Sequence, residues 1–313
     1  MARLRLGVAL LLPGPVAHEV NGLRRAVGDK SLGRVPPHLT LVPPVNVREE
    51  RLEDALGVLR AAAASAPAVL RLTLGSAATF LPANPVLYLS VSGDLASLGG
   101  LRDRVFADPL ARPLTWPFVP HVTLADDADP GVLSAAPAVL AGYRVEVSIE
   151  RVHLLEEVRV AGHRVWRPIA DVAFGPPAVV GRGGPLALEL VRGSLIDPMA
   201  AAALRAGGGA GEGVGVEGVG VDGDSSPRVV VTGLREGRVA GVGVAWLGPD
   251  GGQVCVWVVP AHRRQGIGGH LLAAVEAAVA DAGWGCSRLS GIGPAGFYAA
   301  RSRFSVGESE GSE

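Results

Sequence analysis

Apolar and polar stretches in the first 175 residues predict a strand–helix–strand unit that occurs twice in the same order. Apolar runs indicate the strands, and apolar residues three or four positions apart indicate the helices. The first copy comprises a strand over Leu4–Leu12, a helix over Val16–Val27 and a strand beginning at His38; the second comprises a strand over Val86–Val91, a helix over Leu95–Phe106 and a strand beginning at His121. Such an internal repeat predicts two similar lobes that face each other.

The third element of each copy opens with a His-x-Thr motif. The two motifs are His38-Leu39-Thr40-Leu41 and His121-Val122-Thr123-Leu124, and each follows a proline. Because side chains alternate between the faces of a strand, each histidine shares a face with its threonine, while the apolar residues turn into a core. A single His-x-Thr is common, but two in matching halves of a repeat indicate that both imidazoles and both hydroxyls meet at one place.

This set of side chains suits acid–base chemistry on one phosphate. An imidazole with an unperturbed pKa of about 6.5 both accepts and donates protons near neutrality. Threonine hydroxyls donate hydrogen bonds to phosphate oxygens and stabilise charge in the transition state. No metal is required for this chemistry. The sequence does not decide the roles; our working assignment takes His38 as the acid and His121 as the base.

The paired motifs resemble the 2H phosphoesterase superfamily, in its 2'-5' RNA ligase and cyclic phosphodiesterase branch. The stretch Pro117-Phe118-Val119-Pro120-His121 is typical of that branch, and the resemblance covers residues 1–175. It implies an α+β fold, a two-lobed and pseudo-symmetric domain with antiparallel sheets. It also implies catalysis by His38, Thr40, His121 and Thr123, without a cofactor, on 2',3'-cyclic phosphates or 2'-5' linkages of RNA or nucleotides.

The rest of the chain predicts further elements and a second domain. In the first domain we expect a helix over Arg48–Ala64 and strands over Val69–Leu74, Arg144–Val152 and Val165–Phe174. Glycines and prolines over residues 176–185 indicate a linker, and residues 206–227 form a low-complexity loop. Within the second domain, 186–313, we expect strands over Leu186–Val191, Arg228–Thr232, Arg238–Leu247 and Val254–Val259, and helices over Pro198–Arg205 and Ile267–Ala282.

A glycine-containing loop between the last predicted strand and helix carries the second motif, Arg263-Arg264-Gln265-Gly266-Ile267-Gly268-Gly269. Glycines let the backbone approach a ligand closely. The first amides of a helix point outward without partners, and the helix dipole favours an anion there. This loop therefore predicts a binding site for a pyrophosphate or a similar anion.

The same stretch resembles motif A of the GNAT acetyltransferases, over residues 186–306. The resemblance implies an α/β domain with a mixed sheet that binds acetyl-CoA, and Tyr298 as the acid that protonates the leaving thiolate. The cofactor-binding residues that it implies are Val258, Val259, Arg263, Arg264, Gln265, Gly266, Ile267, Gly268 and Gly269. No glutamate lies in the strand Val254–Val259 to act as a general base, so the amine acceptor stays open.

The composition of the chain limits the kinds of partner that it is expected to bind. The formal net charge is −1, which lacks the positive balance of proteins that grip long nucleic acids. RNA ends or cyclic nucleotides, acetyl-CoA and an unknown amine acceptor are the expected partners. Two cysteines indicate a reduced, cytoplasmic protein rather than a disulfide scaffold. No apolar run reaches the roughly 18 residues of a membrane span.

Three hypotheses remain open from the sequence. The first is a phosphodiesterase or 2'-5' RNA ligase-like enzyme fused to an acetyl-CoA-binding, acetyltransferase-like domain. The second is an N-acetyltransferase whose first half is a non-catalytic nucleotide-binding module. The third is a non-catalytic RNA-end binder with a domain that senses coenzyme A. All four His-x-Thr side chains are present, which favours the first hypothesis.

Overall fold

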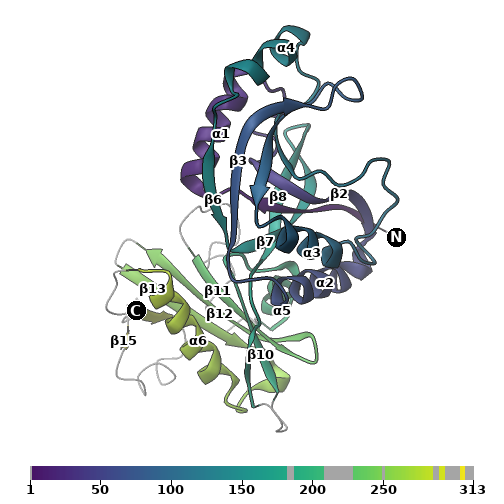
Figure 1. Cartoon of the computed structure of the whole chain (residues 1–313). Helices are drawn as coiled ribbons and strands as arrows, with labels where there is room; N and C mark the ends of the chain where they lie inside the picture. Colours follow the sequence, from purple (N-terminus) through teal and green to yellow (C-terminus); the bar gives the residue numbers. More distant parts are fainter. Residues whose placement is uncertain are drawn as a thin grey trace. The chain divides into compact units, whose positions relative to one another are not determined.

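The computed structural model divides into two compact units, residues 1–176 and 177–313 (Figure 1). It describes residues 2–181, 187–207, 228–248, 251–284, 289–292 and 304–306. Each unit contains its own β-sheet.

The first unit contains an eight-stranded sheet in the order β6-β3-β4-β5-β2-β1-β7-β8, with every neighbouring pair antiparallel. Its strands are β1 (Arg3–Leu11), β2 (His38–Arg48), β3 (Leu70–Thr79), β4 (Leu87–Gly93), β5 (His121–Ala125), β6 (Val145–Ile149), β7 (Arg151–Val160) and β8 (His163–Ala173). The order is symmetric about the junction of β5 with β2. The predicted repeat is therefore present as two four-stranded halves of one sheet.

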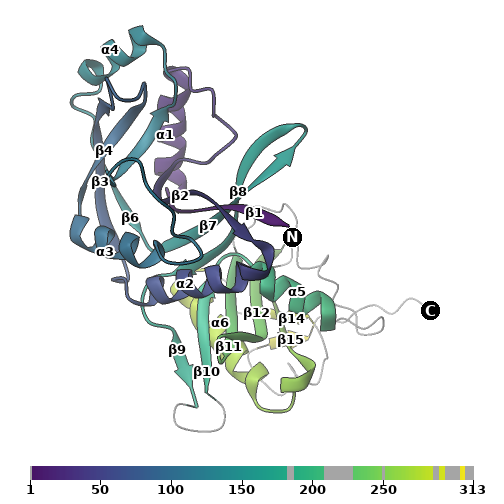
Figure 2. The same cartoon turned by 90° about the vertical axis from the view of Figure 1, so that its right-hand side faces the viewer.

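The helices of this unit are α1 (Gly14–Ala26), α2 (Leu52–Ala64, after a 3-10 turn over Glu49–Arg51), α3 (Leu95–Val105) and α4 (Pro130–Val139). Helix α2 contacts α3, β7 and β8, while α4 packs on β3 (Figure 2). The helix of each repeat contacts the histidine strand of the other repeat, α1 with β5 and α3 with β2. This exchange ties the two halves of the sheet together.

The predicted alternation of faces is confirmed at the histidine strands. Leu39, Leu41, Val122 and Leu124 are at most 1% exposed and lie in the core of the unit. The histidines and threonines between them are half-buried. The core therefore anchors both strands and leaves one face for polar side chains.

Within residues 2–181, three features differ from the prediction. The single strand expected over Arg144–Val152 is two strands, β6 and β7, because the chain leaves the edge strand of one half at Glu150 and joins β1 in the other half. Helix α4 was not expected; Asp129 caps it by accepting a hydrogen bond from the amide of Gly131 at 2.8 Å. The segment expected as a linker contains the short strand β9 (Ala178–Val180), in which two valines favour extended pairing with β10.

The second unit contains a seven-stranded mixed sheet in the order β15-β14-β13-β12-β11-β10-β9. Strands β9 to β13 are antiparallel neighbours, whereas β13, β14 and β15 run parallel. Its other elements are β10 (Leu188–Gly193), α5 (Pro198–Gly207), β11 (Arg228–Arg235), β12 (Arg238–Gly248), β13 (Gly251–Val258), a 3-10 turn over Pro260–His262, α6 (Ile267–Asp281), β14 (Leu289–Ile292) and β15 (Phe304–Val306). The mixed sheet expected for this half is confirmed.

Helices α5 and α6 cover opposite faces of this sheet. Val229 and Val231 pack in the same cluster as Leu271 of α6, whereas Val230 packs with Ala200 of α5, as alternation along a strand requires. Two glycines of β12 let α6 come close. A Cβ atom at Gly243 would lie 2.6 Å from Val275 Cγ2, and one at Gly241 would lie 2.8 Å from Leu271 Cδ1.

No helix in the described part of the chain is both long enough and apolar enough to cross a membrane. Cys255 is a free, half-buried thiol, and burial raises its pKa to about 11. The second cysteine, Cys286, lies outside the described residues.

Candidate functional site

Both His-x-Thr motifs lie at the junction of the two halves of the first unit. Strands β2 and β5 pair antiparallel with Leu39 opposite Val122. Antiparallel geometry therefore sets His38 opposite Thr123 and Thr40 opposite His121, with all four side chains on one face. The two histidines are diagonal neighbours, for which the Cβ separation is about 7 Å. The structure thus brings together the four residues predicted from the sequence.

Each imidazole is held by the same local hydrogen bond. Nδ1 of His38 lies 2.8 Å from the carbonyl oxygen of Pro36, and Nδ1 of His121 lies 2.7 Å from that of Val119. A carbonyl oxygen only accepts, so Nδ1 carries the proton in both rings. Nε2 of each ring is then the nitrogen that gains or loses a proton in the site.

Electrostatics couple the two histidines. Burial lowers the pKa of His38, the hydrogen bond to Pro36 opposes that shift, and positive charge on Arg24 and on His121 lowers the pKa further. Burial also lowers the pKa of His121, against the hydrogen bond to Val119. Because the charge of His121 acts on His38, the two rings lie within electrostatic reach of each other. Both imidazoles are therefore weaker bases than a free histidine.

Two aromatic rings that the sequence pattern did not predict contact the imidazole of His121. The Phe80 ring meets the imidazole edge-on, with the ring centroids 5.0 Å apart, and the Tyr88 ring does so at 5.4 Å. Phe80 and Tyr88 stack on each other at 4.2 Å. Tyr88 stands opposite Thr123 in the ladder between β4 and β5, so it shares the face of the site. These contacts fix the ring plane of His121.

The two aromatic residues just before His121 along the chain differ in their exposure to solvent. Trp116 is 64% exposed, whereas Phe118 is half-buried beneath the guanidinium of Arg102 at 5.4 Å. The sequence left open whether these rings stack on a base or line a wall. Phe118 packs against α3, and Trp116 is the one that stands in solvent.

A buried arginine organises the loop that leads to His38. Arg24 donates from Nε to Asp29 at 2.8 Å and from Nη1 to the carbonyl oxygen of Val35 at 3.0 Å. Its Nη2 donates to the hydroxyl of Ser31, which in turn bonds the carboxylate of Asp29. The signal in the sequence was an arginine four residues after the core residue Val20, on the buried stripe of a helix.

The predicted anion-binding loop lies between β13 and α6 of the second unit. Gly266 is the N-cap of α6 with φ of 81°, and Arg264 has φ of 61°. The backbone amides of residues 264–268 have no hydrogen-bond acceptor within the described structure. Gly269 differs from the prediction, because its amide donates to the carbonyl oxygen of Gly266 at 3.0 Å and so begins the helix. Five consecutive amides therefore remain for an anion.

Side chains of this loop mostly support its shape. Arg263 Nε donates to the carbonyl oxygen of Val258 at 3.3 Å, and Gln265 accepts from Arg235 Nη1 at 3.0 Å. The side chain of Ile267 is buried in the core beneath α6, so only its backbone faces a ligand. Val258 ends the preceding strand, and Val259 is the N-cap of the 3-10 turn that follows it. Tyr298, the predicted acid, lies outside the described residues.

The chain is similar to known proteins in both units. Residues 12–161 match the profile of the 2'-5' RNA ligase superfamily, and residues 217–300 match the acetyltransferase (GNAT) family. A protein of Bacillus pumilus (strain SAFR-032) named "Putative phosphoesterase" is 31% identical over 168 residues, which is 52% of this chain and 95% of the relative. A similarly named protein of Bacillus cereus (strain B4264) is 29% identical over 161 residues, 50% and 90% of the two chains. The solved structure of E. coli LigT complexed with 3'-AMP is 21% identical with a TM-score of 0.45, covering 55% of this chain and 99% of the other.

The repeated histidine strands and the relatives define a phosphoesterase-type domain in the first unit. This chain belongs to the 2'-5' RNA ligase superfamily, and residues 217–300 of its second unit match the family model of the GNAT acetyltransferases.

Proposed function

We propose that the first unit is a phosphodiesterase that opens 2',3'-cyclic phosphates or cleaves 2'-5' linkages of RNA or nucleotides, and that the second unit binds acetyl-CoA. The observation that carries the first part is the doubled arrangement at His38 and His121. Each ring is fixed through Nδ1, and each has a threonine of the other strand opposite it. The shared face supports two proton carriers on either side of one phosphorus atom.

The chemistry follows from the protonation of the two rings. One neutral imidazole takes a proton from water on Nε2, and the water oxygen forms a new bond to phosphorus. The bond from phosphorus to the ribose oxygen breaks, and the other imidazole, protonated on Nε2, gives its proton to that oxygen. Our working assignment keeps His38 as the acid and His121 as the base. In ligation a 5'-hydroxyl takes the place of water: one imidazole takes its proton, its oxygen bonds to phosphorus, and the ribose oxygen leaves with the proton of the other imidazole. Cleavage of the 2'-5' linkage by the neighbouring ribose hydroxyl is that step in reverse, with the roles exchanged.

The threonines supply the charge stabilisation in this proposal. Thr40 and Thr123 lie across from the two imidazoles on the same face, and each hydroxyl donates one hydrogen bond. Donors aimed at the phosphate oxygens stabilise the charge that builds as water adds. The proton transfers and the charge are then both handled by side chains of the two motifs, so turnover is expected to persist in EDTA.

Turnover of a 2',3'-cyclic mononucleotide tests this function. We expect product from the wild type in the presence of EDTA, and a loss of at least 100-fold in kcat for His38→Ala and for His121→Ala. His163→Ala is the matched control, because this histidine is exposed and lies outside the site. Equal rates in the two site variants and the control would contradict the proposal. An inert wild type that transfers acetyl groups would favour the acetyltransferase hypothesis instead.

The second unit is proposed to hold the pyrophosphate of acetyl-CoA on the amides of residues 264–268. Five donors without acceptors at the start of a helix fit a doubly charged anion. When bound, acetyl-CoA would supply the activated acyl group. A rise in melting temperature with acetyl-CoA tests this part.

A further inference from the structure

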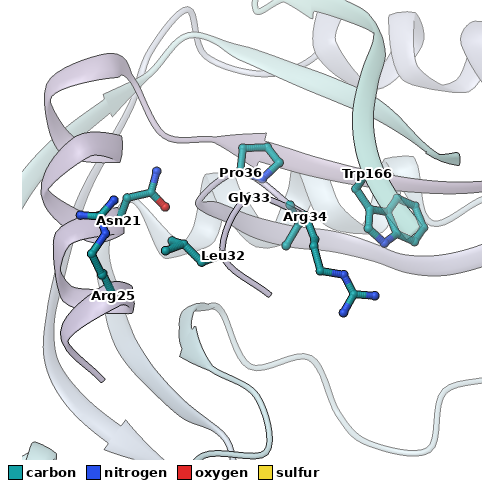
Figure 3. Close-up of a pocket in the computed structure, with 8 residues that line it drawn as sticks. Asn21, Arg25, Leu32, Gly33, Arg34, Pro36 and Trp166 are labelled. Carbon is teal, nitrogen blue, oxygen red and sulfur yellow. The ribbon is translucent and has the colours of Figure 1, made fainter. Parts of the chain in front are cut away.

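A surface pocket lies beside the His-x-Thr face, and no step of the proposed chemistry uses it. It has a volume of about 390 Å³ and lies between α1, the loop that precedes β2, and β8 (Figure 3). Its lining residues are Asn21, Arg25, Leu32, Gly33, Arg34, Val35, Pro36 and Trp166. The volume is within the range of small-molecule sites.

The pocket opens on the same face of the sheet as the catalytic motifs. A Cβ atom at Gly7 would lie 3.5 Å from the indole of Trp166, so this ring lies over β1 on the side to which Gly7 points. Gly7 and Ala9 share that side of β1, and Ala9 is paired with Thr40. The indole and the Thr40 hydroxyl therefore lie on one face, separated by strand β1 and part of β2.

The wall of the pocket is also part of the support of His38. Pro36 lines the pocket, and its carbonyl oxygen accepts the hydrogen bond from Nδ1 of His38 at 2.8 Å. Only Pro37 separates the pocket residue Pro36 from His38 along the chain. A substrate that continues past the reacting phosphate on this side would enter the pocket next.

The charges in the pocket favour a phosphate. Arg25 and Arg34 are both exposed there, and none of the described residues that line the pocket carries a carboxylate. Neither guanidinium forms an ion pair within the described part of the chain; Arg34 donates from Nε to the carbonyl oxygen of Arg164 at 3.2 Å, which leaves both of its Nη groups. The Asn21 oxygen accepts from Arg24, so its NH₂ group is the part that can donate to a ligand. Figure 3 shows the Asn21 amide and the Trp166 ring on opposite sides of the pocket.

From these observations we infer that the pocket is a subsite for a second nucleotide of the substrate. Trp166 offers an aromatic surface for the base, while Arg25 and Arg34 bind the adjoining phosphate. This inference rests on the proposed function and extends it: the enzyme prefers an oligonucleotide end with at least two nucleotides over a cyclic mononucleotide.

Two substrates compared on the full chain test the subsite. We expect kcat/KM for a dinucleotide ending in a 2',3'-cyclic phosphate to exceed that for the cyclic mononucleotide by about tenfold or more, the contribution of one stacked base. Arg25→Gln and Trp166→Leu are each expected to reduce this preference by about tenfold. Arg104→Gln is the matched control, since Arg104 is an exposed arginine on α3 whose side chain donates to the carbonyl oxygen of Gly100 in the same helix. Arg25 lies on the helix surface, so its variant keeps the fold even where the tryptophan variant does not.

Calorimetric binding of a dinucleotide 3'-monophosphate separates failure of the subsite from failure of the proposed function. We expect Arg25→Gln to weaken this binding about tenfold and Arg104→Gln to leave it as in the wild type. If the wild type turns over the mononucleotide without preferring the dinucleotide, and Arg25→Gln changes neither measurement, the subsite is wrong while the function stands. If the wild type turns over neither substrate but binding responds to Arg25, the function is wrong and the subsite stands.

Discussion

Arg24 and Asp29 form a 2.8 Å ion pair whose side chains are 4% and 1% exposed. The arginine reaches from α1 to the loop before β2, where it also holds the carbonyl oxygen of Val35 and the hydroxyl of Ser31. Val35 is three residues before His38. One buried ion pair therefore fixes the segment that leads to the His38 imidazole.

Removing one partner of this ion pair is expected to lower the stability of the first unit strongly. Arg24→Met leaves the Asp29 carboxylate buried without its counter-charge, which destabilises a protein by about 3–5 kcal/mol. Urea unfolding of the full chain measures this loss, which is read from the unfolding transition of the first unit. The double variant Arg24→Met with Asp29→Leu should recover part of it, since no charge is then left unpaired. A single variant as stable as the wild type would contradict the role of the pair.

The pH profile of kcat/KM should lie at lower pH than a profile governed by histidines with an unperturbed pKa. The base must be neutral, so the rate falls as pH drops through its pKa; the acid must be protonated, so the rate falls as pH rises through its pKa. Burial lowers the pKa of both His38 and His121. Both limbs of the bell-shaped profile of the free enzyme should therefore lie below about 6.5. A rising limb centred above 7 would be inconsistent with this environment.

The threonines can be tested without changing their shape. Thr40→Val and Thr123→Val remove a hydroxyl and keep a β-branched residue in the strand. Each should lower kcat by about 10²–10³, the usual loss of one donor to developing charge, with a smaller change in KM. Thr73→Val, on a half-buried position of β3, serves as the control. Unchanged kcat in both site variants would exclude the hydroxyls from the transition state.

A third histidine of the first unit should make stability depend on pH. Burial lowers the pKa of His153 to about 4, although the charge of Asp171 opposes the shift. The unfolded chain, with a histidine pKa of about 6.5, binds the proton first, so stability falls as pH drops from 6.5 and the full loss of roughly 3 kcal/mol is reached below pH 4. His153→Gln cannot titrate. In urea titrations, the first unit of this variant should lose less stability between pH 7 and pH 4.5 than the first unit of the wild type.

Substitutions of the two glycines at the ends of α6 distinguish loss of ligand binding from the effect of backbone strain. Gly266 at the start and Gly283 just after the end both have positive φ, 81° and 68°. Alanine at either position is strained by about 1–2 kcal/mol. Gly266→Ala also disturbs the free amides, so it should abolish the rise in melting temperature with acetyl-CoA, whereas Gly283→Ala should keep it. Loss of the rise in both variants would indicate a general effect on the fold.

The structural features that depend on local periodicity could be predicted from the sequence. Alternation placed His38 and Thr40 on one face of a strand, and the repeat placed the second motif in the matching half. The position of Gly266 at the start of a helix also followed from the local pattern of strand, glycine loop and apolar helix. These features need no knowledge of which strands become neighbours.

The remaining site residues depend on contacts across the sheet. Phe80 and Tyr88 reach His121 because β4 lies beside β5, and Trp166 reaches β1 because the indole fits over Gly7. Nothing in the local pattern marks these aromatic residues. Helix α4 escaped prediction for a different reason: Pro137 inside it removes a backbone donor and weakens the helical pattern.

The ladder between β2 and β5 contributes a single register pair, Leu39 with Val122, whereas every other ladder of the eight-stranded sheet has four or more. Helix packing bridges this narrow ladder, because α1 contacts β5 and α3 contacts β2. The spacing of the His38 and His121 imidazoles therefore depends on how these helices pack as well as on one register pair. Substitutions at Leu39 or Val122 are expected to change that spacing without altering the polar side chains of either motif.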